Sequence, residues 1–198
     1  MATNIKTWEI VEGKLSPIKS TLADNNRKET EHLESWIKTK PEILGTDILI
    51  IGEQVFTKSG PLDFLAIDNN GNIVVVELKR DKLARVALAQ AIDYASDLST
   101  WDIDKLSEIC MSYTGNSLEE HIAENFEDIE IDDLTINQTQ RLLLVGFSIE
   151  ESLIRMIEWL SSNFDLTVNA IILNYVKTSN GTELLSRTVT IPEEIAKE

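Results

Sequence analysis

The sequence predicts an α/β protein in which helices flank a mixed central β-sheet. The first observation is a pair of apolar segments, 62–67 and 73–79, joined by the linker Asp68-Asn69-Asn70-Gly71-Asn72. A short Asp/Asn/Gly linker between apolar segments is typical of a β-hairpin. The second observation is that segments with helical periodicity stand before and after this hairpin.

Each further element is predicted from its local pattern. Leu33, Trp36 and Ile37 recur at the spacing of one helix face and predict a helix from about Lys28 to Thr39, ended near Pro41. Asn180-Gly181 marks the turn between the last two strands. The other predicted elements are an opening strand pair at 5–20, strands at 48–57 and 141–147, a helix at 81–98, irregular helical structure at 100–128, an acidic loop at 129–138, a helix at 150–163, and final strands at 166–176 and 182–190.

We interpret the 198 residues as one domain, because this length can bury a substantial core. Within it we expect N-terminal strands and a loop at 1–28, a catalytic core at 29–98, and an acidic helical insert followed by C-terminal strands at 99–198. The sequence has no stretch of about 18 apolar residues and its N-terminus lacks a signal-peptide pattern. We therefore expect a cytoplasmic protein that does not enter a membrane. The single cysteine, Cys110, excludes an intramolecular disulfide and a cysteine-cluster metal site.

Asp63, Glu77 and Lys79 are the candidate functional residues of the predicted hairpin. Side chains alternate along a strand, so Glu77 and Lys79 project to the same side. They follow consecutive valines, and charges at the end of so apolar a strand are costly unless they pair or bind metal. Carboxylate oxygens suit Mg²⁺ or Mn²⁺. The alternatives are a surface salt bridge between Glu77 and Lys79 and a turn or cap role for Asp63.

An Asp on one strand and Glu-x-Lys on the next resembles the PD-(D/E)XK metal-dependent nucleases, although here the motif opens to Pro61-Leu62-Asp63. The surrounding sequence resembles the catalytic domain of the NucS-like endonucleases of that superfamily, the DUF91 group. The shared features are a helical E-x-L-E (Glu31-His32-Leu33-Glu34), G-x-(I/L)-D-x-L-x-x-D-x-x-G-x-x-x-V-x-E-L-K-R, and a later Q-x-x-x-Y. The resemblance is close over residues 29–98 and looser beyond.

This resemblance implies a restriction-endonuclease-like core and an endonuclease that hydrolyses DNA with Mg²⁺ or Mn²⁺, in DNA repair or defence. It implies metal ligands at Asp63, Glu77 and Glu31, with Glu34 competing with Glu31 for the helix position. The further site residues it implies are Lys79, Gln90 and Tyr94. Archaeal relatives carry an additional N-terminal DNA-binding and dimerisation domain, so the preferred DNA structure is not transferred.

The charge of the chain opposes nucleic-acid binding, because the formal net charge is −16 and DNA-binding surfaces are usually basic. The charge is unevenly distributed. Residues 1–99 contain 12 lysines and arginines and 15 acidic residues, whereas residues 100–198 contain 6 and 19. The dense basic group is Lys79, Arg80, Lys82 and Arg85, beside the candidate site. Two alternatives to an enzyme stay open: a catalytically silent nucleic-acid-binding module and an acidic protein-interaction component.

The C-terminal hairpin, 166–190, predicts a homodimer. Its segment 168–173 is apolar, and a terminal strand left at a sheet edge invites pairing with a second copy. The alternative is that the helix at 150–163 covers this hairpin and that the protein is a monomer.

Overall fold

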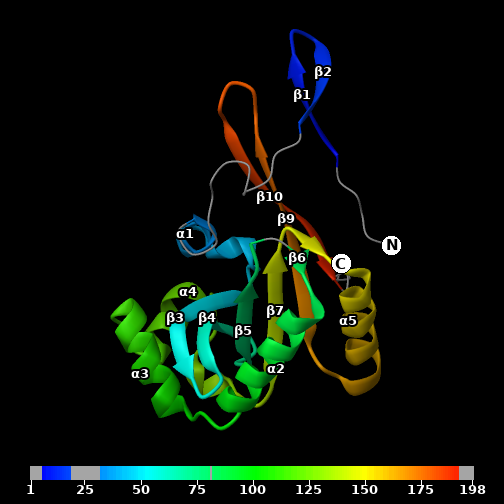
Figure 1. Ribbon diagram of the computed structural model, residues 1–198. Coiled ribbons are helices and arrows are strands. Elements are labelled where there is room, and N and C mark those ends of the chain that lie inside the picture. The colour runs from blue at the N-terminus through cyan, green and yellow to red at the C-terminus, as the bar shows by residue number, and fades with distance from the viewer. Residues whose placement is uncertain (1–5, 19–31, 81, 192–198) are drawn as a thin grey trace.

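The computed structural model describes residues 6–18, 32–80 and 82–191. Its centre is a six-stranded sheet in the order β10-β9-β7-β5-β4-β3 (Figure 1). Strands β3 to β5 form an antiparallel meander, β5, β7 and β9 are parallel, and β10 is antiparallel to β9. The predicted fold class, a mixed sheet flanked by helices, is confirmed. The strands are β3 (Ile48–Thr57), β4 (Gly60–Asp68), β5 (Ile73–Leu78), β7 (Gln140–Gly146), β9 (Val168–Lys177) and β10 (Glu183–Ile191).

The predicted hairpin between β4 and β5 is present, and its turn is held by Asp68. The Asp68 Oδ1 atom accepts hydrogen bonds from the backbone amides of Asn70 and Asn72, each at 3.0 Å. Gly71 adopts a φ of 84°, which glycine tolerates without steric cost. All six residues of β5 are buried. This central position explains the unbroken apolar run, because both faces of the strand are covered.

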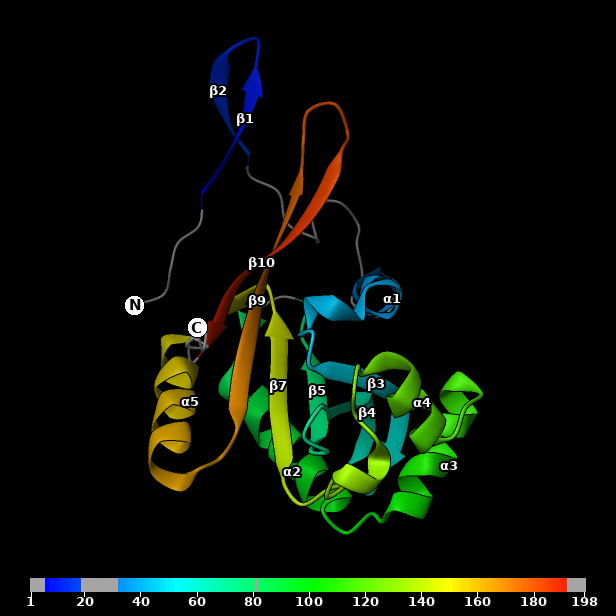
Figure 2. The same cartoon turned by 180° about the vertical axis from the view of Figure 1, so that it is seen from behind.

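Helices cover the two faces of the sheet unequally (Figures 1 and 2). The first core cluster joins Ile73 and Val75 of β5 to side chains from the later helices, and the second joins Val74, Val76 and Leu78 to α1. By this alternation Glu77 projects toward the α2 face and Leu78 toward the α1 face. The helices are α1 (Glu34–Thr39), α2 (Arg85–Leu98), α3 (Ile103–Thr114), α4 (Leu118–Asn125) and α5 (Glu151–Phe164).

One predicted helix boundary differs from the structure, and another lies outside the described residues. The helix expected from Asp81 begins at Arg85, because β6 (Lys82–Leu83) first pairs in parallel with β8 (Ser148–Ile149). The α-helix expected from about Lys28 is described only from Glu34, and residues 28–31 lie outside the described part of the chain. A two-residue bridge carries no hydrophobic periodicity, so its pattern could not reveal β6.

The region expected to be irregularly helical consists of two capped helices. Gly115, at a φ of 86°, ends α3, and Ser117 begins α4 with a capping box shared with Glu120. The expected acidic loop at 129–138 is only partly a loop. It contains the 3₁₀ turn η4 (Ile131–Asp133), and its apolar side chains pack against the core.

The opening strand pair is confirmed as a separate hairpin, β1 (Thr7–Val11) and β2 (Lys14–Ile18), which stands beside the β9–β10 hairpin (Figures 1 and 2). The Glu9 carboxylate accepts hydrogen bonds from Ser179 N at 3.1 Å and Ser179 Oγ at 3.0 Å. No helix in the described residues is long and apolar enough to cross a membrane. Cys110 is buried.

Candidate active site

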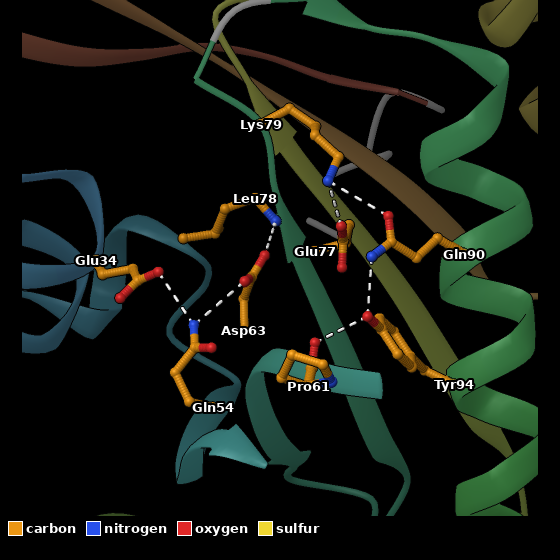
Figure 3. Close-up of polar contacts among 9 residues, drawn as sticks. All are labelled: Glu34, Gln54, Pro61, Asp63, Glu77, Leu78, Lys79, Gln90 and Tyr94. Carbon is orange, nitrogen blue, oxygen red and sulfur yellow. Dashed lines mark hydrogen bonds and ion pairs between the residues drawn. The ribbon is translucent and has the colours of Figure 1, made fainter. Parts of the chain in front are cut away.

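Asp63 lies where β4 and β5 separate. The last paired residues of these strands are Phe64 and Val76, so Asp63 and Glu77 each lie one position beyond the ladder. The Asp63 Oδ2 atom accepts a hydrogen bond from Leu78 N at 2.8 Å (Figure 3). A side-chain carboxylate thus takes the place of a backbone acceptor, and this bond fixes Asp63 against the end of β5.

Glu77 and Lys79 interact directly at the end of β5. Glu77 is 1% exposed, and its Oε1 atom accepts a hydrogen bond and ion pair from Lys79 Nζ at 2.5 Å. The backbone amide of Lys79 donates to Val145 O at 2.8 Å, which extends the pairing with β7 past Leu78. A buried carboxylate is costly unless it is compensated, and Lys79 supplies that compensation here. The pairing alternative raised for these two residues is therefore present, but in a half-buried position rather than on an open surface.

Gln90 and Tyr94, one helical turn apart on α2, connect Lys79 to β4. Lys79 Nζ donates to Gln90 Oε1 at 3.4 Å, and Gln90 Nε2 donates to Tyr94 Oη at 2.8 Å. The Tyr94 hydroxyl donates to the carbonyl oxygen of Pro61 at 2.8 Å (Figure 3). This chain of hydrogen bonds holds α2 against the strand that carries Asp63. Sequence reasoning placed both residues on one helix face, and the structure brings that face to Lys79.

Two further residues complete the polar group around Asp63. Gln54 Nε2 donates to Glu34 Oε1 at 3.2 Å and to Asp63 Oδ1 at 3.4 Å (Figure 3). Gln54 lies on β3 with a φ of 48°, an uncommon left-handed conformation for a residue with a side chain. Glu34 begins α1 and is only 5% exposed. Glu31, the other residue considered for this helix position, lies outside the described residues.

Sequence reasoning weighed Glu34 but missed Gln54. A signal for Glu34 was available, because it lies three residues before Ile37 on the buried side of the helix. Nothing in the sequence marked Gln54, since its role depends on a left-handed backbone conformation within a mostly apolar strand. The group brought together by the structure is therefore Glu34, Gln54, Asp63, Glu77, Lys79, Gln90 and Tyr94.

The electrostatics of the group favour a cation. Burial raises the pKa of the Asp63 carboxyl above its ordinary value, and this outweighs the hydrogen bond from Leu78 N, the charge of Lys79 and the hydrogen bond from Gln54. A carboxylate with a raised pKa is poorly solvated in its charged form. A bound cation would favour that charged form.

Asp63 and Glu77 are the side chains that could hold a metal ion. In the described residues, no three His, Cys, Asp or Glu side chains gather to form a complete protein cage. Mg²⁺ does not require one, because it is commonly held by one or two carboxylates together with water and substrate phosphates. Two hard oxygen donors on adjacent strands therefore fit Mg²⁺ or Mn²⁺, with Glu34 behind them through Gln54.

Comparison with known proteins identifies similar chains. A segment of 59 residues is 41% identical to endonuclease NucS of Aeropyrum pernix, covering 30% of this chain and 23% of that protein. This chain thus spans about a quarter of the length of its curated relative. No protein-family profile matches the chain.

Two solved structures align with 72% of this chain at 20% identity. One is an EndoMS complex with double-stranded DNA, with a TM-score of 0.45 over 44% of that chain. The other is a repair endonuclease from Pyrococcus abyssi, with a TM-score of 0.39 over 46% of that chain. In sequence, over the 59 matched residues, the predicted resemblance to the NucS-like endonucleases is confirmed.

Proposed function

We propose that this protein is a Mg²⁺- or Mn²⁺-dependent endonuclease that hydrolyses phosphodiester bonds in DNA. The observation that carries the proposal is the convergence of Asp63, Glu77 and Lys79 at the separated ends of two strands, joined to α2 through Gln90. The sequence similarity to an endonuclease supports the same class. DNA as the substrate comes from the motif resemblance, and the role is in repair or defence.

Asp63 and Glu77 would hold the metal ion, and each is already oriented by the protein. Leu78 N and Gln54 fix the two oxygens of Asp63, and Lys79 fixes Glu77. A bound divalent ion would polarise the scissile phosphate and lower the pKa of an attacking water. Ligand orientation by surrounding hydrogen bonds strengthens metal binding, so Gln54 is assigned a positioning role.

Lys79 would stabilise negative charge on the phosphate during hydrolysis. Its ammonium is held between Glu77 and Gln90 and is partly exposed, with a side chain that is 32% accessible. A cation fixed where charge develops costs little reorganisation during the reaction. Gln90 and Tyr94 restrict where Lys79 can lie, because their hydrogen bonds continue to the backbone of Pro61.

One observation favours a second function, that of a catalytically silent nucleic-acid-binding module. The Glu77 carboxylate is already ion-paired with Lys79, and both Asp63 oxygens already accept hydrogen bonds. These contacts hold both carboxylates in place without metal. Hydrolysis requires that Glu77 bind the ion in addition to its ion pair with Lys79, whereas silent binding does not.

A cleavage assay separates the two functions. Single-stranded, mismatched and flapped DNA are incubated with Mg²⁺ or Mn²⁺ and wild-type protein, Lys79→Ala, Glu77→Gln or the control Lys105→Ala. Lys105 is a lysine of α3 that pairs with Glu108 on the surface. We expect Lys79→Ala and Glu77→Gln to lose about 10²–10³-fold in rate and Lys105→Ala to cleave as the wild type does. Cleavage by Lys79→Ala at the wild-type rate would remove the lysine from the mechanism. Binding of DNA without cleavage by the wild-type protein would favour the binding module.

A further inference from the structure

A hollow of about 310 Å³ lies beside α2 and α5, apart from the group around Asp63. It is lined by Arg85, at the start of α2, and by Ser152, Arg155, Met156 and Trp159 of α5. The four α5 residues recur at the spacing of one helix face, and α5 contacts α2. Arg85 and Gln90 share a helix, so this hollow and the candidate active site are built on the same rigid element.

Two arginines in one hollow are unexpected in a chain with a net charge of −16. Neither Arg85 nor Arg155 forms an ion pair with any residue that the structure describes. Carboxylates are available nearby, since Glu151 and Glu158 lie four residues before and three residues after Arg155 on α5. Two unpaired positive charges in the same hollow repel each other unless an anion lies between them. The hollow is therefore suited to an anionic ligand.

Trp159 adds an aromatic surface to this positive hollow. It is 56% exposed, and Phe164 packs against it edge-on with ring centroids 4.6 Å apart. Phe164 supports the indole without burying it. Exposed aromatic side chains beside basic ones form the stacking platforms of proteins that bind single-stranded nucleic acid. A base in a paired duplex is already stacked between its neighbours, so a tryptophan platform favours an unpaired base.

We propose that this hollow binds an unpaired segment of DNA next to the cleavage site, with Arg85 and Arg155 on phosphates and Trp159 stacked on a base. The inference rests on the proposed nuclease function and adds to it a DNA-binding surface on α2 and α5, outside the active site. The chain continues from the active site to the hollow through β6, whose Lys82 is exposed. The DNA backbone would follow the same direction.

Binding is measured without cleavage, by fluorescence anisotropy in EDTA with a labelled oligothymidylate of about 12 nucleotides. Arg85→Ala and Arg155→Ala should each weaken binding about tenfold and each reduce the salt dependence by about 0.7 in log–log slope. Trp159→Ala should weaken binding by about 5- to 100-fold, and Trp159→Phe should keep most of the affinity. Lys105→Ala controls for the loss of one positive charge, and thermal melting checks that each variant is folded.

An abasic oligonucleotide with the same number of phosphates tests the stacking. Wild type and Trp159→Ala should bind it equally, because no base is present to stack. The proposal is wrong if Trp159→Ala weakens the abasic and thymidylate probes by the same factor, or if the arginine variants bind as tightly as wild type. A polyglutamate peptide that displaces thymidylate at equal concentration would reassign the hollow to an acidic protein partner.

The nuclease proposal is tested separately by cleavage with Mg²⁺ or Mn²⁺. Lys79→Ala should lose cleavage, and in that background Arg85→Ala and Trp159→Ala should still weaken thymidylate binding. If the wild-type protein cleaves DNA but Arg85→Ala, Arg155→Ala and Trp159→Ala bind thymidylate as tightly as it does, the proposal for the hollow is wrong. The nuclease proposal would still hold. If the substitutions in the hollow weaken thymidylate binding but the wild-type protein cleaves no DNA, only the nuclease proposal is wrong.

Discussion

Asp63→Asn should stabilise the protein without metal and abolish its stabilisation by metal. Burial makes the charged form of Asp63 costly and raises its pKa. Asparagine removes the charge and keeps an oxygen to accept the hydrogen bond from Leu78 N. Its amide group would then face Gln54, so part of the gain is lost at that contact. The same substitution removes one of the two carboxylates proposed to hold the ion.

The expected effects of Asp63→Asn on stability without metal and with metal are opposite in sign. Single stabilising substitutions commonly give about 0.5–2 kcal/mol, which for a domain of this size corresponds to a rise in Tm of about 1–8 °C. Metal at a concentration 100 times its Kd adds about 2.7 kcal/mol to the free energy of unfolding of the wild type, or about 5–10 °C. The variant should therefore be the more stable protein in EDTA and the less stable one in excess Mn²⁺.

The advantage of the variant should also depend on pH. The folded-state pKa of Asp63 lies above its unfolded value, so the proton binds more tightly to the folded state. The stability that Asp63 contributes is then fully present below the unfolded pKa, about 3.9, and is lost as pH rises through the folded pKa. In EDTA the difference between asparagine and aspartate should grow from acid to neutral pH.

Differential scanning fluorimetry of both proteins in EDTA and in a Mn²⁺ series, at acid and neutral pH, measures these effects. Asp97→Asn is a matched control, because Asp97 is a surface aspartate that accepts a hydrogen bond from Ser59 N. An Asp63→Asn protein that is stabilised by Mn²⁺ as much as the wild type would place the metal elsewhere. A variant less stable than wild type in EDTA at neutral pH would show that the burial cost of Asp63 is already compensated.

Three further changes test neighbouring parts of the structure. Leu78→Ala should lower the free energy of unfolding by about 2–4 kcal/mol, because Leu78 is fully buried on the α1 face. Chemical denaturation measures this loss. An equal loss of stability in Lys79→Ala would contradict the faces assigned to the two side chains. Gln54→Ala should raise the Mg²⁺ concentration for half-maximal cleavage about tenfold, and a fall in maximal rate at unchanged metal dependence would argue against a positioning role. Light scattering should give the mass of two chains, because β10 ends the sheet as an edge strand; the mass of one chain at all concentrations would refute the dimer.

Much of the fold was predictable because its central strands are unusually apolar. The run Ile73–Leu78 and the turn at Asp68 and Gly71 define a buried hairpin strand without any tertiary information. That Gln90 and Tyr94 lie on the same side of α2 was also predictable, because helical geometry fixes which residues share a face. Their contact with Lys79 then follows from packing α2 on the end of β5.

Other features depend on contacts that leave no local pattern. Gln54 reaches Glu34 and Asp63 only because its φ is positive within β3, and an apolar strand gives no sign of such a bend. The pairing of β6 with β8 joins residues far apart in the chain through two residues each. The residues around η4 look like a solvated loop by composition, yet their alternate apolar side chains are needed to close the core.

The charge of the chain can be reconciled with DNA binding by where the elements lie. The acidic residues between Asp102 and Asp133 lie on α3, α4 and η4 and in the turns beside them, and α3 packs on β3 at one edge of the sheet. Arg85 and Arg155 belong to α2 and α5, and α5 packs on β9 near the opposite edge. Because exposed charges act over about one Debye length, roughly 8–10 Å at physiological salt, the acidic helices repel DNA locally and leave the α2–α5 side accessible. The path from Asp63 toward Trp159 thus leads away from the acidic edge, and added salt should weaken repulsion and attraction together.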